Sequence, residues 1–142
     1  MCDVPETVDH IFFVCPLAKF AWECIREALG WSRTPKSHQD FLDNWVPSGC
    51  SQHDLKMTVL STVMWALWNA RNKMAIEGVF IRCPTAIIFR INFFLQRWKV
   101  LLRGEDRADL ETWELQVSAW VENFLEKLRD RRSCSFLVLL VA

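Results

Sequence analysis

The segment from residue 53 to residue 77 constrains the fold most. Its sequence predicts one long helix whose surface is apolar on almost every side. Its central stretch, residues 57–68, contains only three polar side chains, Thr58, Ser61 and Thr62. A helix that is apolar on nearly all sides is usually central and covered by its neighbours. We therefore expect this helix to be buried in the middle of the molecule.

Five further helical segments are predicted from apolar side chains that recur every three or four residues. Thr7 is expected to cap the first segment, Pro16 to open the second and Gly30 to end it. No alternation with a period of two is long enough to predict a strand, so the predicted fold class is all-α. The segments cover residues 7–14, 16–29, 39–45, 84–103 and 107–131.

The last two predicted helices differ sharply in charge. Residues 78–104 contain five basic residues and no acidic one, whereas residues 105–130 contain eight acidic and three basic residues. A short turn joins the two helices, so we expect an antiparallel hairpin with opposite charges side by side. Neutralisation of the basic helix by its partner is the interpretation that this pattern favours.

The alternative interpretation is that the basic helix binds phosphates of RNA or DNA. Phe89 and Phe93 lie near these cations and would be able to stack on bases, although packing on a neighbouring helix is the simpler expectation. The phosphate contacts would be Arg90, Arg97, Lys99 and Arg103.

Composition narrows the remaining functional classes. The chain has 142 residues, six of them cysteines, and a formal net charge of zero, so no global field attracts it to nucleic acid or to acidic membranes. No signal peptide and no apolar run of the roughly 20 residues needed for a membrane span occur. We expect reduced thiols in an intracellular protein of the nucleus or cytoplasm, not a secreted one.

Catalytic motifs are missing from the sequence. Tyr is absent, glycine occurs only four times, and the chain has neither an Asp-Asp pair nor a G-x-S-x-G motif. Polymerase chemistry needs paired metal-binding carboxylates, and phosphate loops need glycines. We expect a protein that is not an enzyme and takes no small-molecule substrate.

Three residues near the N-terminus, Cys2, His10 and Cys15, have the ligand chemistry of a zinc site. His10 falls within a helical turn and Cys15 just past its end, so both side chains can converge on one ion. A closed structural site needs four ligands, however, and only three are present. From the residues alone, buried thiols and an ordinary histidine are the simpler interpretation.

The stretch "VPETVDHIFFVCPLAKFAW" resembles the zinc-binding region near the C-terminus of plant LINE-type (non-LTR) retrotransposon reverse transcriptases. The family pattern is a C-x2-C pair, a Glu-Thr pair, a His, an apolar trio and a Cys, with a Trp on the next helix. The resemblance implies zinc held by the cysteines and the histidine. The matching residues are Cys2, Glu6, Thr7, His10, Cys15 and Trp22.

A second stretch, "WALWNARN" at residues 65–72, resembles a segment that is common downstream in the same elements. Trp65, Trp68 and Asn72 fall on one side of the long helix. They would form a nucleic-acid surface, or a core tryptophan cluster whose polar neighbours tie down a loop. The apolar surroundings favour the core cluster.

The resemblance implies a piece of a reverse transcriptase C-terminal region that helps to bind RNA or DNA without catalysis. The first cysteine of the family's pair would lie before Met1, so we expect a truncated zinc finger. Residues 1–30 would hold this partial motif and the first helix, and residues 31–142 a helical region ending in the helix pair. The alternative is a helical protein-interaction module, or a relic with no selected activity.

Overall fold

The computed structural model describes the backbone of residues 4–47 and 49–141, and the side chains of those up to Arg131. Across these residues the chain is helical and has no strand, which confirms the predicted all-α class. In chain order the elements are η1 (His10–Val14), α1 (Pro16–Leu29), α2 (His38–Asp40), η2 (Phe41–Trp45), α3 (His53–Glu77), α4 (Thr85–Trp98), η3 (Lys99–Leu101) and α5 (Gly104–Val141).

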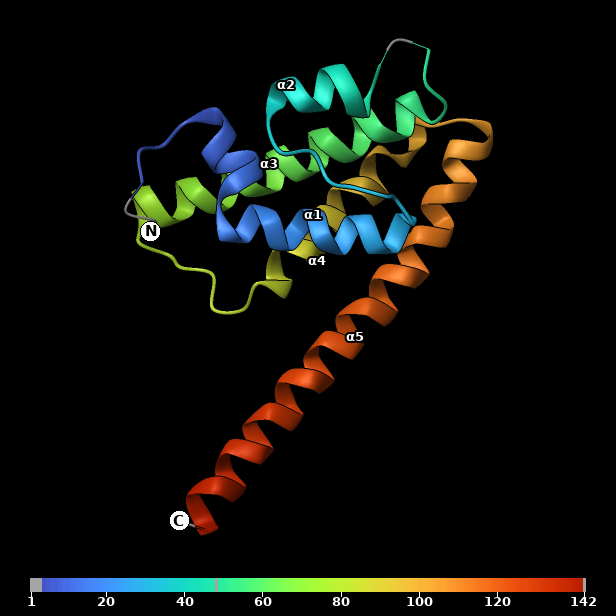
Figure 1. The fold of residues 1–142 in the computed structure, drawn as a ribbon. Helices are drawn as coiled ribbons and strands as arrows, with labels where there is room; N and C mark the ends of the chain where they lie inside the picture. The colour runs from blue at the N-terminus through green and yellow to red at the C-terminus, as the bar shows by residue number, and fades with distance from the viewer. Residues whose placement is uncertain (1–3, 48, 142) are drawn as a thin grey trace.

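Helix α3 is the central element of the fold (Figure 1). It has the bounds predicted from its apolar run and contacts η1, α1, α4 and α5. Its inner side is lined by small and branched side chains that are almost completely buried. These side chains are Leu55, Val59, Val63, Ala66 and Ala70.

Helix α1 begins and ends where predicted, and for local reasons. Pro16 occupies its first turn, where no backbone N–H is needed. Gly30 follows the last residue with a φ of 65°, a left-handed conformation that glycine adopts without strain. The N–H groups of Gly30 and Trp31 then donate to the carbonyls of Glu27 and Arg26, which closes the helix end.

The N-terminal segment folds back against α1. The hydroxyl of Thr7 accepts a hydrogen bond of 3.1 Å from the N–H of His10, which confirms the predicted cap. The indole Nε1 of Trp22 donates to the carbonyl of Phe12 at 2.8 Å, and its ring stacks on Phe13 with 6.0 Å between centres. Trp22 therefore fastens η1 to the helix that follows it.

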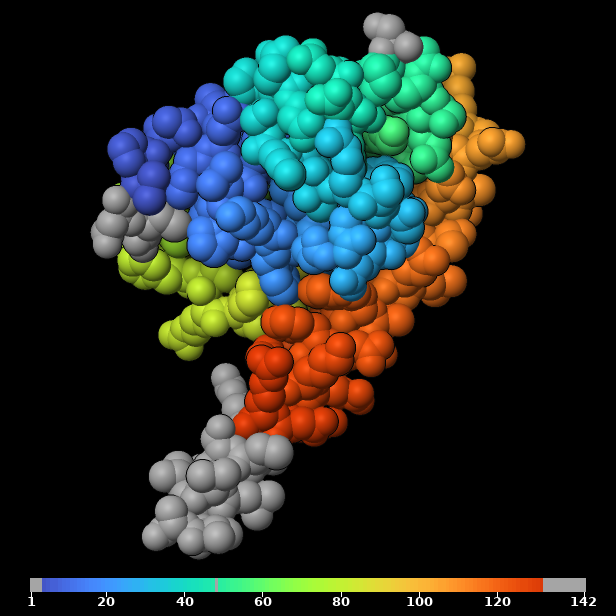
Figure 2. Space-filling view, in the orientation of Figure 1, coloured from blue at the N-terminus to red at the C-terminus, as the bar shows by residue number. Residues whose placement is uncertain are grey.

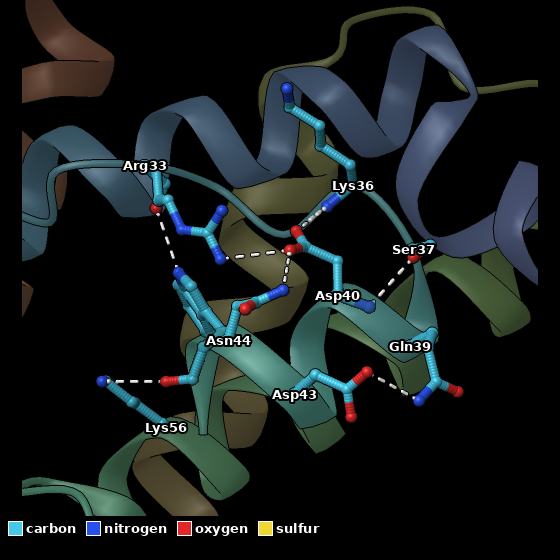
Figure 3. A network of polar contacts seen from close by, with 9 residues as sticks. Arg33, Lys36, Ser37, Gln39, Asp40, Asp43, Asn44 and Lys56 are labelled. Carbon is cyan, nitrogen blue, oxygen red and sulfur yellow. Dashed lines mark hydrogen bonds and ion pairs between the residues drawn. The ribbon is translucent and has the colours of Figure 1, made fainter. Parts of the chain in front are cut away.

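The loop from α1 to α2 is organised by the Asp40 carboxylate (Figure 3). This carboxylate accepts hydrogen bonds from the Lys36 backbone and the Asn44 amide at 3.0 Å, and from the Arg33 guanidinium at 3.1 Å. These bonds, foremost the one from Lys36, hold the pKa of Asp40 below its ordinary value. The Asp40 N–H in turn donates to Ser37, which caps α2.

Helices α4 and α5 do not pair along their length, so the predicted antiparallel hairpin is wrong. Helix α4 packs mainly on α3, and α5 packs mainly on α1, whose end it crosses in Figure 1. The rings of Trp120 and Phe124 on α5 both meet Phe20 of α1 edge-on, and the Trp120 indole donates to Glu27. The reason is that α4 packs on the apolar surface of α3. The apolar side chains of α5 then pack on α1 instead of on α4.

One hydrophobic core joins these elements. Its buried side chains run from Phe13 in η1 to Val121 in α5. In the space-filling view, α1 and the segment containing α2 cover the front face, and α5 extends below them (Figure 2). Over the residues that the structure describes, no helix is both long and apolar enough to cross a membrane.

Candidate nucleic-acid interface

A shallow groove of about 550 Å³ runs between α3 and α4. It forms because two rigid helices pack along each other and leave a furrow between their outward-facing rows of side chains. The row on α3 and the row on α4 both combine aromatic rings with cations. The lining residues are Trp65, Asn69 and Lys73 on α3 and Phe89, Arg90, Phe93 and Phe94 on α4.

Three of the rings in this groove are largely open to solvent. Trp65 is 47% exposed, Phe89 58% and Phe93 56%. The expectation that Phe89 and Phe93 pack on a neighbouring helix is therefore wrong. Monomeric proteins rarely gather large apolar side chains on one exposed patch without a binding role.

Trp65 and Trp68 also overturn the expected core cluster, because Trp68 is 38% exposed as well. A helix that is apolar all round does not reveal which side will be covered. In α3 the small residues Ala66 and Ala70 allow close packing on the inner side, and the bulky indoles lie on the outer side. A polar neighbour does tie down another part of the chain, as that interpretation expected, because Arg71 forms an ion pair with Glu6 of the N-terminal segment.

The cations of the groove lie beside its rings. The guanidinium carbon of Arg97 is 5.6 Å from the centre of the Phe93 ring, within the range of a cation–π contact. Arg90 and Lys73 line the groove itself. The Arg97 contact covers one face of Phe93 and places a phosphate-binding group next to a ring that is otherwise largely exposed.

The charge of the groove is not balanced by α5. Among the described residues, no ion pair joins a cation of α4 to an acid of α5. The predicted neutralisation of the basic helix is therefore wrong, and the packing explains it, because α4 lies on α3 instead. Of the four predicted phosphate contacts, only Arg90 lines the groove; Arg97 adjoins it through the ring of Phe93, and Lys99 and Arg103 are not among its lining residues.

Lys73 is the residue that sequence reasoning missed. A count over both helices would have found it, because the chain from residue 55 to residue 104 has eight basic residues and a single acidic one, Glu77. Counting charges only from residue 78 onward left out the α3 side of the groove. The pairing of α3 with α4 is what makes the longer count meaningful.

A second cavity, of about 90 Å³, lies between the N-terminal segment and α3. His10 and Cys15 both line it, together with Glu6 and Arg71. Two of the three predicted zinc ligands therefore border one space, while Cys2 lies outside the described residues. Within the described part of the chain, no group of three His, Cys, Asp or Glu side chains is arranged to hold a metal ion.

Cys24 of α1 offers no additional zinc ligand. Cys24 is fully buried in α1, and this burial, with a smaller effect of Glu27, raises the pKa of its thiol to about 12. A thiol must lose its proton to bind zinc, so Cys24 is unsuited to the role.

The chain matches no protein-family model, no curated protein and no solved structure.

Proposed function

We propose that this chain binds nucleic acid, without catalysing a reaction, through the groove between α3 and α4. The observation that carries the proposal is the combination of three exposed rings with the cations Lys73 and Arg90 in one furrow, and with Arg97 next to its Phe93 ring. Cations bind phosphates, and aromatic rings stack on bases, so the two together suit a polynucleotide. A purely apolar partner would leave the cations unused.

The resemblance to LINE-type reverse transcriptases supports the same proposal. The segment "WALWNARN", one of the two stretches that carry the resemblance, contributes Trp65 and Asn69 to the groove. In the intact element such a region is expected to help bind RNA or DNA during target-primed reverse transcription. We propose accordingly that the chain is a non-catalytic, helical part of such an element.

The test is binding of a fluorescently labelled 15-nucleotide RNA or DNA, measured by anisotropy over a range of salt concentrations. Three phosphate contacts predict that log K falls with log[salt] with a slope of about −2 for a single strand. Arg90→Ala and Arg97→Ala are each expected to make this slope less steep by about 0.7. Arg107→Ala, which removes an exposed cation of α5 away from the groove, is the matched control and should behave as the parent protein.

Absence of binding at low salt would remove the proposal. It would leave a helical protein-interaction module, or a relic with no selected activity, as the better interpretation. Binding that is unaffected by Arg90→Ala and Arg97→Ala but weakened by Arg107→Ala would place the interface elsewhere.

Zinc binding is a second candidate function, because His10 and Cys15 line the same cavity. We propose that these two residues, with Cys2, supply three of the ligands of one structural zinc site. Purified protein should then carry close to one zinc per chain by elemental analysis, and His10→Ala or Cys15→Ser should lose it. Cys83→Ser is the control and should keep the metal, whereas parent protein that folds normally without zinc would overturn this proposal.

A further inference from the structure

We propose that the α3–α4 groove selects single-stranded nucleic acid over duplexes, by stacking unpaired bases on Trp65 and Phe93. This inference rests on the proposed function and narrows its ligand class. It is carried by the geometry of the rings in the groove, and not by the charges alone, since cations attract single strands and duplexes alike.

The two stacking rings stand on opposite walls of the groove. Trp65 belongs to α3 and Phe93 to α4, and both contact Phe94, which lies between them. The Trp65 and Phe94 rings meet edge-on with 6.5 Å between centres, and Phe93 and Phe94 do so with 5.5 Å. Phe94 is itself partly buried against the core and contacts Trp98 at 6.1 Å. The two exposed rings are therefore held in place before any ligand arrives, which lowers the entropy lost on binding.

A third ring extends the surface along α4. Phe89 precedes Phe93 by four residues, so the two side chains lie on the same side of the helix with a rise of about 6 Å between them. Both are more than half exposed. Successive rings along the groove can receive successive bases of one strand.

Each nucleotide also has a phosphate next to its base, and the groove has a matching arrangement. Arg97 lies over the ring of Phe93, and Arg90 and Lys73 flank the rings from the two walls. A base that stacks at Phe93 brings its phosphate within reach of a guanidinium that is already nearby. Three cations suit a segment of about three or four nucleotides.

A duplex cannot use the same features. Its base faces are covered by neighbouring base pairs, and only the base edges are open in its grooves. A duplex would therefore meet the cations alone, and its affinity would be unaffected by changes to the rings.

The experiment compares a labelled 15-nucleotide single strand, as RNA and as DNA, with the 15-base-pair duplex of the same sequence, by anisotropy at low salt. We expect the single strand to bind at least about tenfold more tightly than the duplex. Phe93→Leu and Trp65→Leu keep an apolar side chain but remove the ring. Each should weaken single-strand binding about tenfold and leave duplex binding unchanged.

Phe80→Leu is the matched control, because Phe80 is 60% exposed but does not line the groove. It should bind every probe as the parent protein does. Circular dichroism and thermal melting establish that the variants fold, and Phe93→Leu decides the question alone if Trp65→Leu is unstable.

The possible outcomes distinguish the preference for single strands from nucleic-acid binding itself. Equal affinity for single strand and duplex, with Phe93→Leu behaving like Phe80→Leu, would overturn strand selection while nucleic-acid binding stands. No binding of any probe would overturn both. Preference for the single strand of RNA, of DNA or of both, lost in Phe93→Leu, supports the inference.

Discussion

Arg71 holds Glu6 across 65 residues of sequence. The guanidinium Nε lies 3.1 Å from Glu6 Oε2, and a second nitrogen of the same group donates to Asn72 at 3.0 Å. The guanidinium also lies over the ring of Trp68, with 5.6 Å to its centre. This ion pair fastens the N-terminal segment to α3 and closes one side of the cavity that His10 lines.

The first prediction concerns the pH dependence of this ion pair. Hydrogen bonds from Arg71 hold the pKa of Glu6 below its ordinary value of 4.5. A carboxyl with a lowered pKa stabilises the fold fully above its unfolded pKa, and this contribution disappears as the pH falls through the folded pKa. Glu6→Gln should therefore melt at a lower temperature than the parent at pH 7, and the difference should shrink as the pH falls below 4.5.

The comparison of the two proteins isolates Glu6, because Asp9 and Asp40 also have lowered pKa values and make both proteins less stable in acid. The measurement is a series of thermal melts between pH 7 and pH 3. A difference between parent and Glu6→Gln that stays constant over this range would show that Arg71 does not act through the charge of Glu6.

Much of the fold could be predicted from sequence where the cause is local. Thr7 caps its turn, Pro16 opens α1 and Gly30 ends it, as expected, because each depends on the conformational preference of a single residue. The bounds of α3 also followed from its uninterrupted apolar run.

The groove could not be predicted from the same information. Its existence depends on α4 packing against α3 instead of α5, which neither periodicity nor charge determines. Trp65 and Phe93 were expected to be covered, because apolar side chains usually are, and only the packing of the inner side of α3 decides that they are not. Sequence reasoning therefore found Arg90 and Arg97 but not the surface to which they belong.

The second prediction contrasts two tryptophans. Trp22 is 1% exposed and its indole donates to the Phe12 carbonyl, so Trp22→Phe loses buried volume and a hydrogen bond. We expect a loss of about 2 kcal/mol in the free energy of unfolding, measured with urea. Trp68→Phe, on the exposed side of α3, should change it by no more than about 0.5 kcal/mol. Equal losses in the two variants would contradict the assignment of their environments.

The third prediction tests the end of α1. Gly30 has a φ of 65°, and, apart from its two chain neighbours, no described residue lies within 4 Å of the position where a Cβ would stand. Any cost of Gly30→Ala is therefore conformational, and we expect about 1 kcal/mol in urea unfolding. Gly30→Asn should cost less, because Asn tolerates the left-handed region better than Ala. An alanine variant as stable as the parent would mean that α1 ends differently.

The fourth prediction concerns the reactivity of Cys24. Burial raises the pKa of its thiol to about 12, with a smaller contribution from the nearby charge of Glu27, and no part of the residue is exposed. At pH 8 only about one thiol in ten thousand would be ionised at that pKa, and the thiolate is the species that alkylating reagents attack. Iodoacetamide should therefore leave Cys24 unmodified in the native protein while it modifies the half-buried Cys50.

Peptide mass spectrometry after timed alkylation checks this, and the urea-unfolded protein, in which both thiols should react at similar rates, is the control. Native Cys24 that reacts as fast as Cys50 would show that α1 separates from the core on the timescale of labelling, because the thiol reaches the reagent only through such an opening.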